Sequence, residues 1–240
     1  MKSFLEICLD SVESCIAAER GGAQRVELCA SLVEEGATPS AGMIAGARNS
    51  IGIALHVMIR PRGGDFCYTD AELEVMKRDV MVAKQLGADG VVFGILTRDG
   101  RVDADRTGEL AALARPMSIT FHRAFDMTDD PFLALEKLVE LRIERVLTSG
   151  RAPSAVEGME LIHSLVKNGG GRIQVMAGGG ITAENAREIR DKTGVREIHV
   201  GSGASRRVSA SSRSGLFAAG SCRTVDSTRV TRIVEALRNH

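Results

Sequence analysis

The sequence predicts a single-domain α/β protein folded as a closed (β/α)8 barrel, a TIM barrel. Short apolar runs alternate eight times with longer amphipathic patterns, at the ~30 residues per unit that a βαβ repeat needs. Strict alternation favours a parallel sheet, and eight units favour a closed barrel over an open, doubly wound sheet. We therefore expect one domain over residues 1–240.

Each expected strand is a short run of apolar or alternating residues bounded by turn-forming residues. In chain order these runs cover residues 4–9, 25–29, 53–60, 89–96, 118–125, 145–149, 173–177 and 197–201. The fourth is almost continuously apolar, as is typical of a strand covered on both faces. Polar side chains gather near the ends of several others, where TIM barrels carry their sites.

The helices between the strands are predicted from their first residues. Three starts pair a capping residue with an acidic residue three positions later: Asp10 with Glu13, Thr69 with Glu72, and Ser154 with Glu157. Two place proline at the first helical position, at Thr38-Pro39 and Asp130-Pro131. Further helices are expected over residues 103–114, from 182 and from 226. The Ser/Arg-rich stretch at about 204–221 shows no period and is expected to be a loop.

Charge and composition narrow the classes of function. Basic and acidic residues number 31 each, so no overall positive field attracts nucleic acid or an anionic membrane. No run approaches the ~18 apolar residues of a membrane helix, and Glu6 and Asp10 interrupt the only run that resembles a signal peptide. Five cysteines without disulfide-framework spacing are typical of a reducing compartment. We expect a cytoplasmic protein with neither nucleic-acid nor membrane partners.

The first two strands carry the same Glu-x-Cys pattern, Glu6 with Cys8 and Glu27 with Cys29. Because side chains alternate along a strand, both pairs point to one face, and neighbouring strands lie about 4.8 Å apart. The two sulfurs can then converge on one soft ion, Cu(I) or Zn(II), with Met58 or a histidine as a third ligand. The alternative is that small cysteines fill the barrel interior.

Inward carboxylates are costly to bury unless they are paired. His56, Arg60 and His122 are the candidate partners, and such a constellation suits proton transfer, with Glu27 as general base, Arg60 as anion binder and His122 as acid. The alternative is an ion-pair layer that only fixes the barrel. His199 points inward on the last strand and is interpreted as a core histidine, although it can also serve as ligand or base.

Arg123 and Asp126, just past the fifth strand, are supporting candidates for an anionic substrate, because guanidinium binds carboxylate or phosphate bidentately. A salt bridge that only orders the loop is the competing interpretation. A second anion site is expected after strands seven and eight, from Gly179, Gly180 and Ser202. Many TIM barrels hold phosphate there through backbone N–H groups, although glycines also serve simply as turns.

Six stretches of the chain resemble the CutC family, described as copper homeostasis proteins. They are Leu5-Glu-Ile-Cys8, Arg25-Val-Glu-Leu-Cys29, Ile59-Arg-Pro-Arg-Gly-Gly-Asp-Phe66, Thr120-Phe-His-Arg-Ala-Phe-Asp126, Val146-Leu-Thr-Ser-Gly150 and Met176-Ala-Gly-Gly-Gly180. The resemblance covers about the first 200 residues. It implies an oligomeric, cytoplasmic TIM barrel that binds Cu(I) through Cys8 and Cys29. The chain departs from the family's His-Ser-Ser-Ala pattern at His199-Val-Gly-Ser-Gly-Ala204.

Three functions of different classes follow. The leading one is a cytoplasmic, CutC-like protein that binds Cu(I), acts in copper homeostasis and forms a homo-oligomer, with a dimer expected. The second is a TIM-barrel enzyme that acts on a small anionic or phosphorylated metabolite by acid/base chemistry. The third is a scaffold whose function lies at an oligomer interface, for which the sequence offers no motif.

Overall fold

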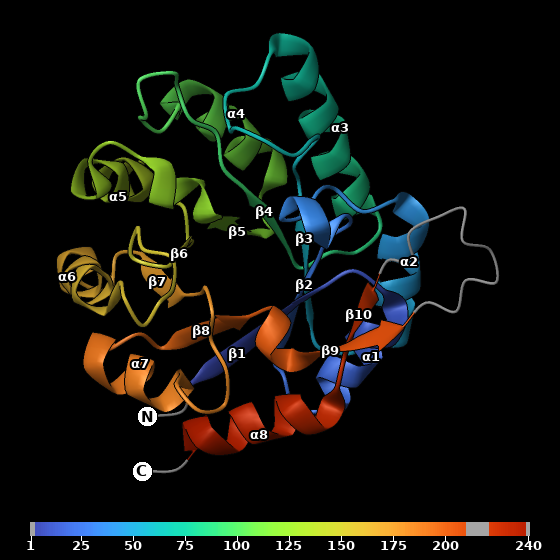
Figure 1. The fold of residues 1–240 in the computed structure, drawn as a ribbon. Coiled ribbons are helices and arrows are strands. Elements are labelled where there is room, and N and C mark those ends of the chain that lie inside the picture. Colours follow the sequence, from blue (N-terminus) through green and yellow to red (C-terminus); the bar gives the residue numbers. More distant parts are fainter. Residues whose placement is uncertain (1–2, 210–220, 239–240) are drawn as a thin grey trace.

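Eight parallel strands close into a barrel, and helices surround it (Figure 1). The computed structural model describes residues 3–209 and 221–238. Each strand pairs in parallel with the next, and β8 pairs with β1 to close the ring. This confirms the predicted (β/α)8 barrel. The strands are β1 (Phe4–Leu9), β2 (Arg25–Leu28), β3 (Ala54–Met58), β4 (Gly90–Phe93), β5 (Ser118–Phe121), β6 (Arg145–Thr148), β7 (Gln174–Ala177) and β8 (Glu197–Val200).

The helices follow the strands in the predicted order. They are α1 (Val12–Arg20), α2 (Ala41–Ser50), α3 (Asp70–Gln85), α4 (Ala104–Ala114), α5 (Pro131–Glu140), α6 (Met159–Gly169), α7 (Ala186–Thr193) and α8 (Ser227–Arg238). Short 3₁₀ helices follow three of the strands: η1 (Leu32–Glu34), η2 (Arg123–Met127) and η3 (Ser202–Ala204). No helix in the described part of the chain is long and apolar enough to cross a membrane.

Two of the predicted helix starts are confirmed in detail. Thr69 and Glu72 form a capping box at α3, and Asp130 caps α5 with Pro131 at its first turn. In both cases the capping side chain accepts hydrogen bonds from backbone N–H groups of the first turn, which have no partner within the helix.

Other helix starts were predicted wrongly, because a second polar residue lies nearby. Ser11, not Asp10, caps α1 by accepting a hydrogen bond from the Ser14 N–H at 3.2 Å. Ser40 caps α2, because the Thr38 hydroxyl instead accepts the Arg60 N–H at the end of β3.

Two later helices also begin after their predicted starts. Ser154 and Glu157 do hydrogen-bond to each other, but in a turn that precedes α6. The Thr182 N–H donates to the Asn185 side chain, and α7 begins one residue after Asn185. The fifth strand also ends early, because His122 accepts the Ala124 N–H and starts η2.

The stretch at about 204–221 was predicted to be a loop, but both of its ends form strands. It begins with β9 (Ser205–Ser209), which pairs antiparallel with β10 (Ser221–Val225); residues 210–220 lie outside the described residues. The polar composition concealed a two-stranded ribbon, because neither of its faces is uniformly apolar. β10 packs beside α1, and the buried Val225 donates its N–H to the Ser14 hydroxyl.

Aliphatic side chains fill the layer between barrel and helices, while the barrel interior is partly charged. Ile7, Val26 and Leu28 are among the fully buried residues of the outer layer. The alternate residues of the same strands point inward. The apolar stripe predicted for the last helix is confirmed, since its four members are buried: Val230, Ile233, Val234 and Leu237.

Candidate metal centre

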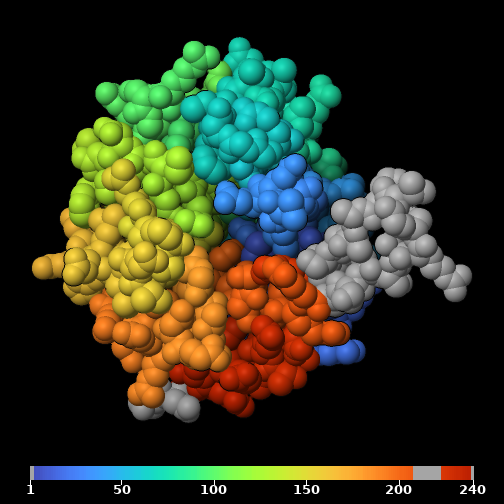
Figure 2. All heavy atoms as spheres, in the orientation of Figure 1, coloured from blue at the N-terminus to red at the C-terminus, as the bar shows by residue number. Residues whose placement is uncertain are grey.

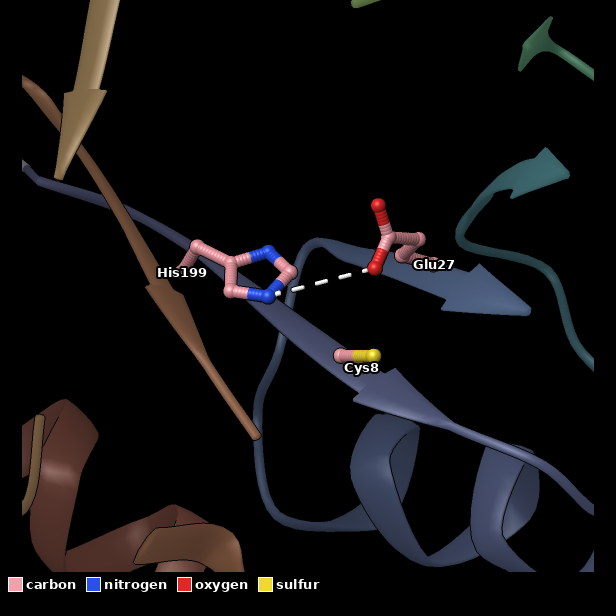
Figure 3. Close-up of side chains that lie close together, drawn as sticks. All are labelled: Cys8, Glu27 and His199. Carbon is pink, nitrogen blue, oxygen red and sulfur yellow. Dashed lines mark ion pairs between the residues drawn. The ribbon is translucent and has the colours of Figure 1, made fainter. Parts of the chain in front are cut away.

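Side chains from β1, β2 and β8 converge inside the barrel (Figure 3). One potential ligand atom from each of Cys8, Glu27 and His199 lies within 4.8 Å of the other two. The strand register explains this convergence, because Cys8 is paired with Glu27 across β1 and β2, and His199 with Glu6 across β8 and β1. Barrel closure therefore joins residues from the two ends of the fold.

Cys29, immediately after β2, adds a second sulfur to the group. Its Sγ lies 3.8 Å from Cys8 Sγ and 3.7 Å from Glu27 Oε2. Two sulfurs bound at about 2.3 Å to one tetrahedral ion lie about 3.8 Å apart, whereas a linear arrangement separates them by about 4.6 Å. The observed spacing fits a three- or four-coordinate ion and needs little movement of the strands.

The side of this group next to Cys29 is soft and apolar. Cys29, Met58 and Val92 form a buried cluster, with Cys8 and Leu32 packed against it. A side chain at Gly36 would meet both Cys29 Sγ and the Met58 methyl group, so the glycine leaves room around the sulfurs. Thiolate and thioether ligands select Cu(I), and the surroundings therefore fit a soft cation.

Glu6 holds the imidazole of His199 in one orientation. The Nδ1 atom lies 2.7 Å from Glu6 Oε1, and Nε2 lies 3.9 Å from Glu27 Oε2. Burial alone would raise the pKa of Glu6, but Arg25 and His199 hold this pKa well below its ordinary value. The ionised Glu6 therefore accepts the Nδ1–H, which leaves Nε2 directed at the candidate centre. Carboxylates that orient metal-binding histidines use this arrangement.

A layer of ion pairs supports Glu6 from below. Arg25 bridges Glu6 and Glu197, and Arg145 also pairs with Glu197 at 2.6 Å. The inward Glu6 is thus paired, as a buried carboxylate must be. Glu27 is only partly satisfied: its Oε2 atom contacts Cys29 and His199, whereas Oε1 is buried without a hydrogen-bond partner among the described residues.

The pKa values show which protons a metal ion must displace. The contact with Cys29 and burial together raise the pKa of Cys8 well above its ordinary value. The contact with Cys8 lowers the pKa of Cys29, but burial and Glu27 outweigh it and raise this pKa to about 11. Burial also raises the pKa of Glu27. Burial lowers the pKa of His199, but Glu27, Cys8 and Glu6 outweigh it and raise this pKa well above its ordinary value. At neutral pH a metal ion must therefore displace a proton from each thiol and from His199.

Arg60 and His122 form a separate group around Phe66. The Arg60 guanidinium donates to the main-chain oxygens of Glu34, Gly36 and Gly64 at 2.8–3.0 Å. Phe66 lies between the two, with its ring 5.0 Å from Arg60 Cζ and 4.9 Å from the His122 ring. No hydrogen bond or ion pair joins Glu27 to either residue in the described part of the chain. Arg60 orders the loops after β2 and β3.

The two other barrel histidines are neutral. Burial lowers the pKa of His56 to about 3. Burial and Arg60 together lower the pKa of His122 to about 3. Because the His122 Nδ1 accepts the Ala124 N–H, Nε2 carries the proton, and this atom is buried without a partner among the described residues. His122 can donate a hydrogen bond but is a weak base at neutral pH.

Arg123 and Asp126 order the loop after β6. They pair with each other at 2.8 Å, and Arg123 also donates to the Ser149 hydroxyl at 2.8 Å. Asp126 accepts hydrogen bonds from the Thr148 hydroxyl and from the N–H groups of Ser149 and Arg151. The loop-ordering interpretation therefore describes this pair.

Of the three residues of the predicted anion site, Ser202 lines a surface cavity beside the β9–β10 ribbon and the two glycines shape the turn after β7. Gly179 and Gly180 have left-handed φ angles of 106° and 68°, and side chains there would meet Ser149 and Ser154 of the preceding loop. The two glycines are required by a close turn, and they do not line the cavity that contains Ser202.

Sequence reasoning underestimated His199. It was interpreted as a core histidine, whereas it lies against Cys8 and Glu27. The available signal was barrel closure, which makes the last strand a neighbour of the first and aligns His199 with Glu6.

The face of the barrel at the carboxyl ends of the strands is open near its centre. Figure 2 shows dark-blue atoms of the N-terminal segment there, between the blue segment after β2 and the orange segment after β8.

The fold and this group of side chains define a class of protein: a TIM barrel whose first, second and last strands present sulfur, carboxylate and imidazole to one point. The CutC family model matches residues 3–204. The copper homeostasis protein cutC homolog of Mus musculus is 54% identical over 203 residues, which are 85% of this chain and 75% of the relative. This chain belongs to the CutC family.

Solved structures agree with this assignment. The crystal structure of the putative copper homeostasis protein CutC from Streptococcus agalactiae is similar with a TM-score of 0.79 and 36% identity, covering 83% of this chain and 98% of that one. Thiamine phosphate pyrophosphorylase from Pyrococcus furiosus shares the fold alone, at a TM-score of 0.63 and 18% identity. The family match ends at residue 204, where the β9–β10 ribbon begins.

Proposed function

We propose that this protein binds Cu(I) through Cys8 and Cys29 and handles copper in the cytoplasm rather than catalysing a reaction. The observation that carries the proposal is the 3.8 Å separation of the two sulfurs, at a point where His199 and Glu27 also converge. Copper is the cargo. Glu27 and His199 complete the ligand set on one side, and Met58 contributes soft surroundings on the other.

The donor set supports Cu(I) on three grounds. Two thiolates prefer soft ions, the buried Glu27 Oε1 has no hydrogen-bond partner among the described residues, and Glu6 fixes the orientation of the His199 ring. Zn(II) also accepts two sulfurs, an imidazole and a carboxylate. Competition between the two ions therefore belongs in the test.

A competitive Cu(I) titration against a chromogenic chelator tests the proposal. We expect the Cys8→Ser/Cys29→Ser variant to bind Cu(I) at least 100-fold more weakly than the parent. The matched control is Cys15→Ala/Cys67→Ser, which also removes two thiols. Cys15 lies on α1 and Cys67 in the loop after β3, and neither belongs to the group of candidate ligands, so this variant should bind as the parent does. Equal affinity of parent and Cys8→Ser/Cys29→Ser would refute the proposal, and tighter Zn(II) than Cu(I) binding would change the cargo.

A second candidate, the enzyme acting on a small anionic metabolite, is favoured by one specific observation. Glu27, Arg60 and His122 each retain a buried polar side-chain atom without a partner in the described part of the chain. Buried polar groups are ordinarily satisfied, so a small ligand with donors and acceptors fits here. Native mass spectrometry of protein taken directly from cells separates the candidates. A retained small anion that His122→Asn abolishes supports the enzyme; retained copper alone supports the first proposal.

A further inference from the structure

A cavity of about 640 Å³ lies at the surface beside the β9–β10 ribbon, outside the barrel interior. On one side it is lined by residues 182–184 after β7, by Ser202 and Gly203 after β8, and by Ser205 at the start of β9. On the other side it is lined by arginines of β9, β10 and α8: Arg206, Arg207, Arg223, Arg229 and Arg232. The volume is in the range of small-molecule sites, roughly 300–1,000 Å³.

Positive charge dominates the cavity wall. The chain as a whole has no net charge, yet five arginines and only one acidic residue, Glu184, line this cavity. Arg232 pairs with Glu184 at 3.3 Å, and Arg206 lies 3.9 Å from Asp226. These pairs are exposed and therefore weak. The positive charge is thus local to this cavity, and the equal numbers of basic and acidic residues in the whole chain do not reveal it.

Two of the arginines are placed at a cost to the fold. Arg207 and Arg223 lie directly opposite each other in the antiparallel ribbon, and like charges in this position are destabilising. Neither has an ion-pair partner within residues 3–209 and 221–238. An anion between the two guanidinium groups would turn this repulsion into attraction, and each group can bind a phosphate bidentately.

The opposite wall brings two barrel loops together. A side chain at Gly203 would overlap the main-chain oxygen of Ile181, so the glycine permits the loops after β7 and β8 to touch. Ser202 lines the same cavity as the arginines. These loops stand at the carboxyl ends of the last two strands, where TIM barrels place phosphate groups. The ribbon supplies the cations that these loops themselves lack.

We propose that this cavity binds a small ligand carrying two or more linked phosphate groups, a diphosphate or triphosphate ester. One phosphate alone compensates only about half of the wall's positive charge, whereas two or three linked phosphates compensate most or all of it. The ligand spans the ribbon and the β8 loop, with Arg207 and Arg223 on one phosphate. The site is independent of the copper proposal, because it shares no residue with the candidate metal centre.

Isothermal titration of the full chain with inorganic pyrophosphate, triphosphate and orthophosphate tests the proposal. We expect pyrophosphate and triphosphate to bind at least tenfold more tightly than orthophosphate, and more weakly as salt concentration rises. The Arg207→Gln/Arg223→Gln variant should lose at least tenfold in pyrophosphate affinity. The control Arg78→Gln/Arg98→Gln removes two exposed arginines elsewhere and should keep the parent's affinity.

Three further measurements make the outcome decisive. Arg232 lines the cavity from α8, outside the ribbon. Arg232→Gln should therefore also weaken pyrophosphate binding, although it leaves the ribbon unchanged. Cu(I) affinity should be the same in all variants, which separates this proposal from the copper one. Absence of pyrophosphate and triphosphate binding at millimolar concentration, or equal losses in pocket and control variants, would overturn it. So would tight binding of a single-stranded RNA that pyrophosphate fails to displace, because the surface would then serve nucleic acid.

Discussion

Glu6 is the residue on which the order of the candidate centre depends. It is fully buried and pairs with both Arg25 and His199. Removing one member of a buried ion pair leaves the other charge without compensation, which typically costs about 3–5 kcal/mol. We therefore expect Glu6→Gln to lower the free energy of unfolding by about this amount, measured in urea. Glu140→Gln, which breaks the exposed pair with Lys137, should cost less than about 1 kcal/mol. Similar losses in both variants would contradict the role of Glu6.

His56 makes the metal-free protein less stable in acid. Its pKa is lowered by burial to about 3 in the folded state, against about 6.5 when unfolded. Between these values the unfolded state binds more protons, so stability falls as the pH falls below 6.5. The loss from pH 7 to pH 5 should be about 2 kcal/mol for this residue.

Urea unfolding at pH 7 and pH 5 measures this effect. His56→Gln should show a smaller loss between the two pH values than the parent. His163→Gln, at an exposed position of α6, serves as the matched control and should keep the parent's pH dependence. An unchanged loss in His56→Gln would mean that other groups cause the acid sensitivity.

At the level of elements, the close contact between α1 and α8 depends on Gly21. A side chain there would overlap Val230 of α8, and overpacking of this kind typically costs 1–3 kcal/mol. We expect Gly21→Ala to destabilise by roughly that amount in thermal or urea unfolding. Val230→Ala in the same chain should not restore stability, because the added methyl group would still lie 2.4 Å from the Cβ atom of residue 230 and 2.8 Å from the Ser227 main-chain oxygen. Gly42→Ala, whose added methyl group meets nothing nearer than 3.9 Å in α2, should be neutral or stabilising.

The elements also show how far local pattern determines structure. Strand and helix order was predictable because hydrophobic period is a property of neighbouring residues. The exact helix starts were less predictable, because tertiary contacts can recruit a capping residue. Thr38, for example, accepts the Arg60 N–H and does not cap α2. Cys8 and Cys29 could be placed together from two matching strands. The pairing of Arg207 with Arg223 could not, because it is long-range and its residues show no apolar period.

The whole molecule determines the remaining part of the site. His199 reaches Cys8 only because β8 closes on β1. His199 contacts Glu6 of β1 although the two residues are 193 positions apart in the sequence. Sequence alone identified both residues as inward-facing but could not fix their distance. The predicted division of roles among Glu27, Arg60 and His122 stays a prediction, and the structure places Glu27 with the sulfurs instead.

The predicted homo-oligomer also belongs to this scale. Met127, Phe132 and Leu133 expose apolar surface near the start of α5, and exposed apolar patches commonly mark protein–protein contacts. We expect a dimer in analytical ultracentrifugation at micromolar concentration, and a monomer for Leu133→Asp. The exposed Val75→Asp on α3 is the control and should stay dimeric. A monomeric parent would contradict the prediction.

X-ray absorption at the copper edge of the Cu(I)-loaded protein tests the central claim most directly. The account predicts two sulfur ligands at about 2.3 Å, completed by a lighter nitrogen or oxygen ligand, and loss of both sulfurs in the Cys8→Ser/Cys29→Ser variant. A first shell of nitrogen and oxygen alone, or one that keeps both sulfurs in that variant, would contradict it.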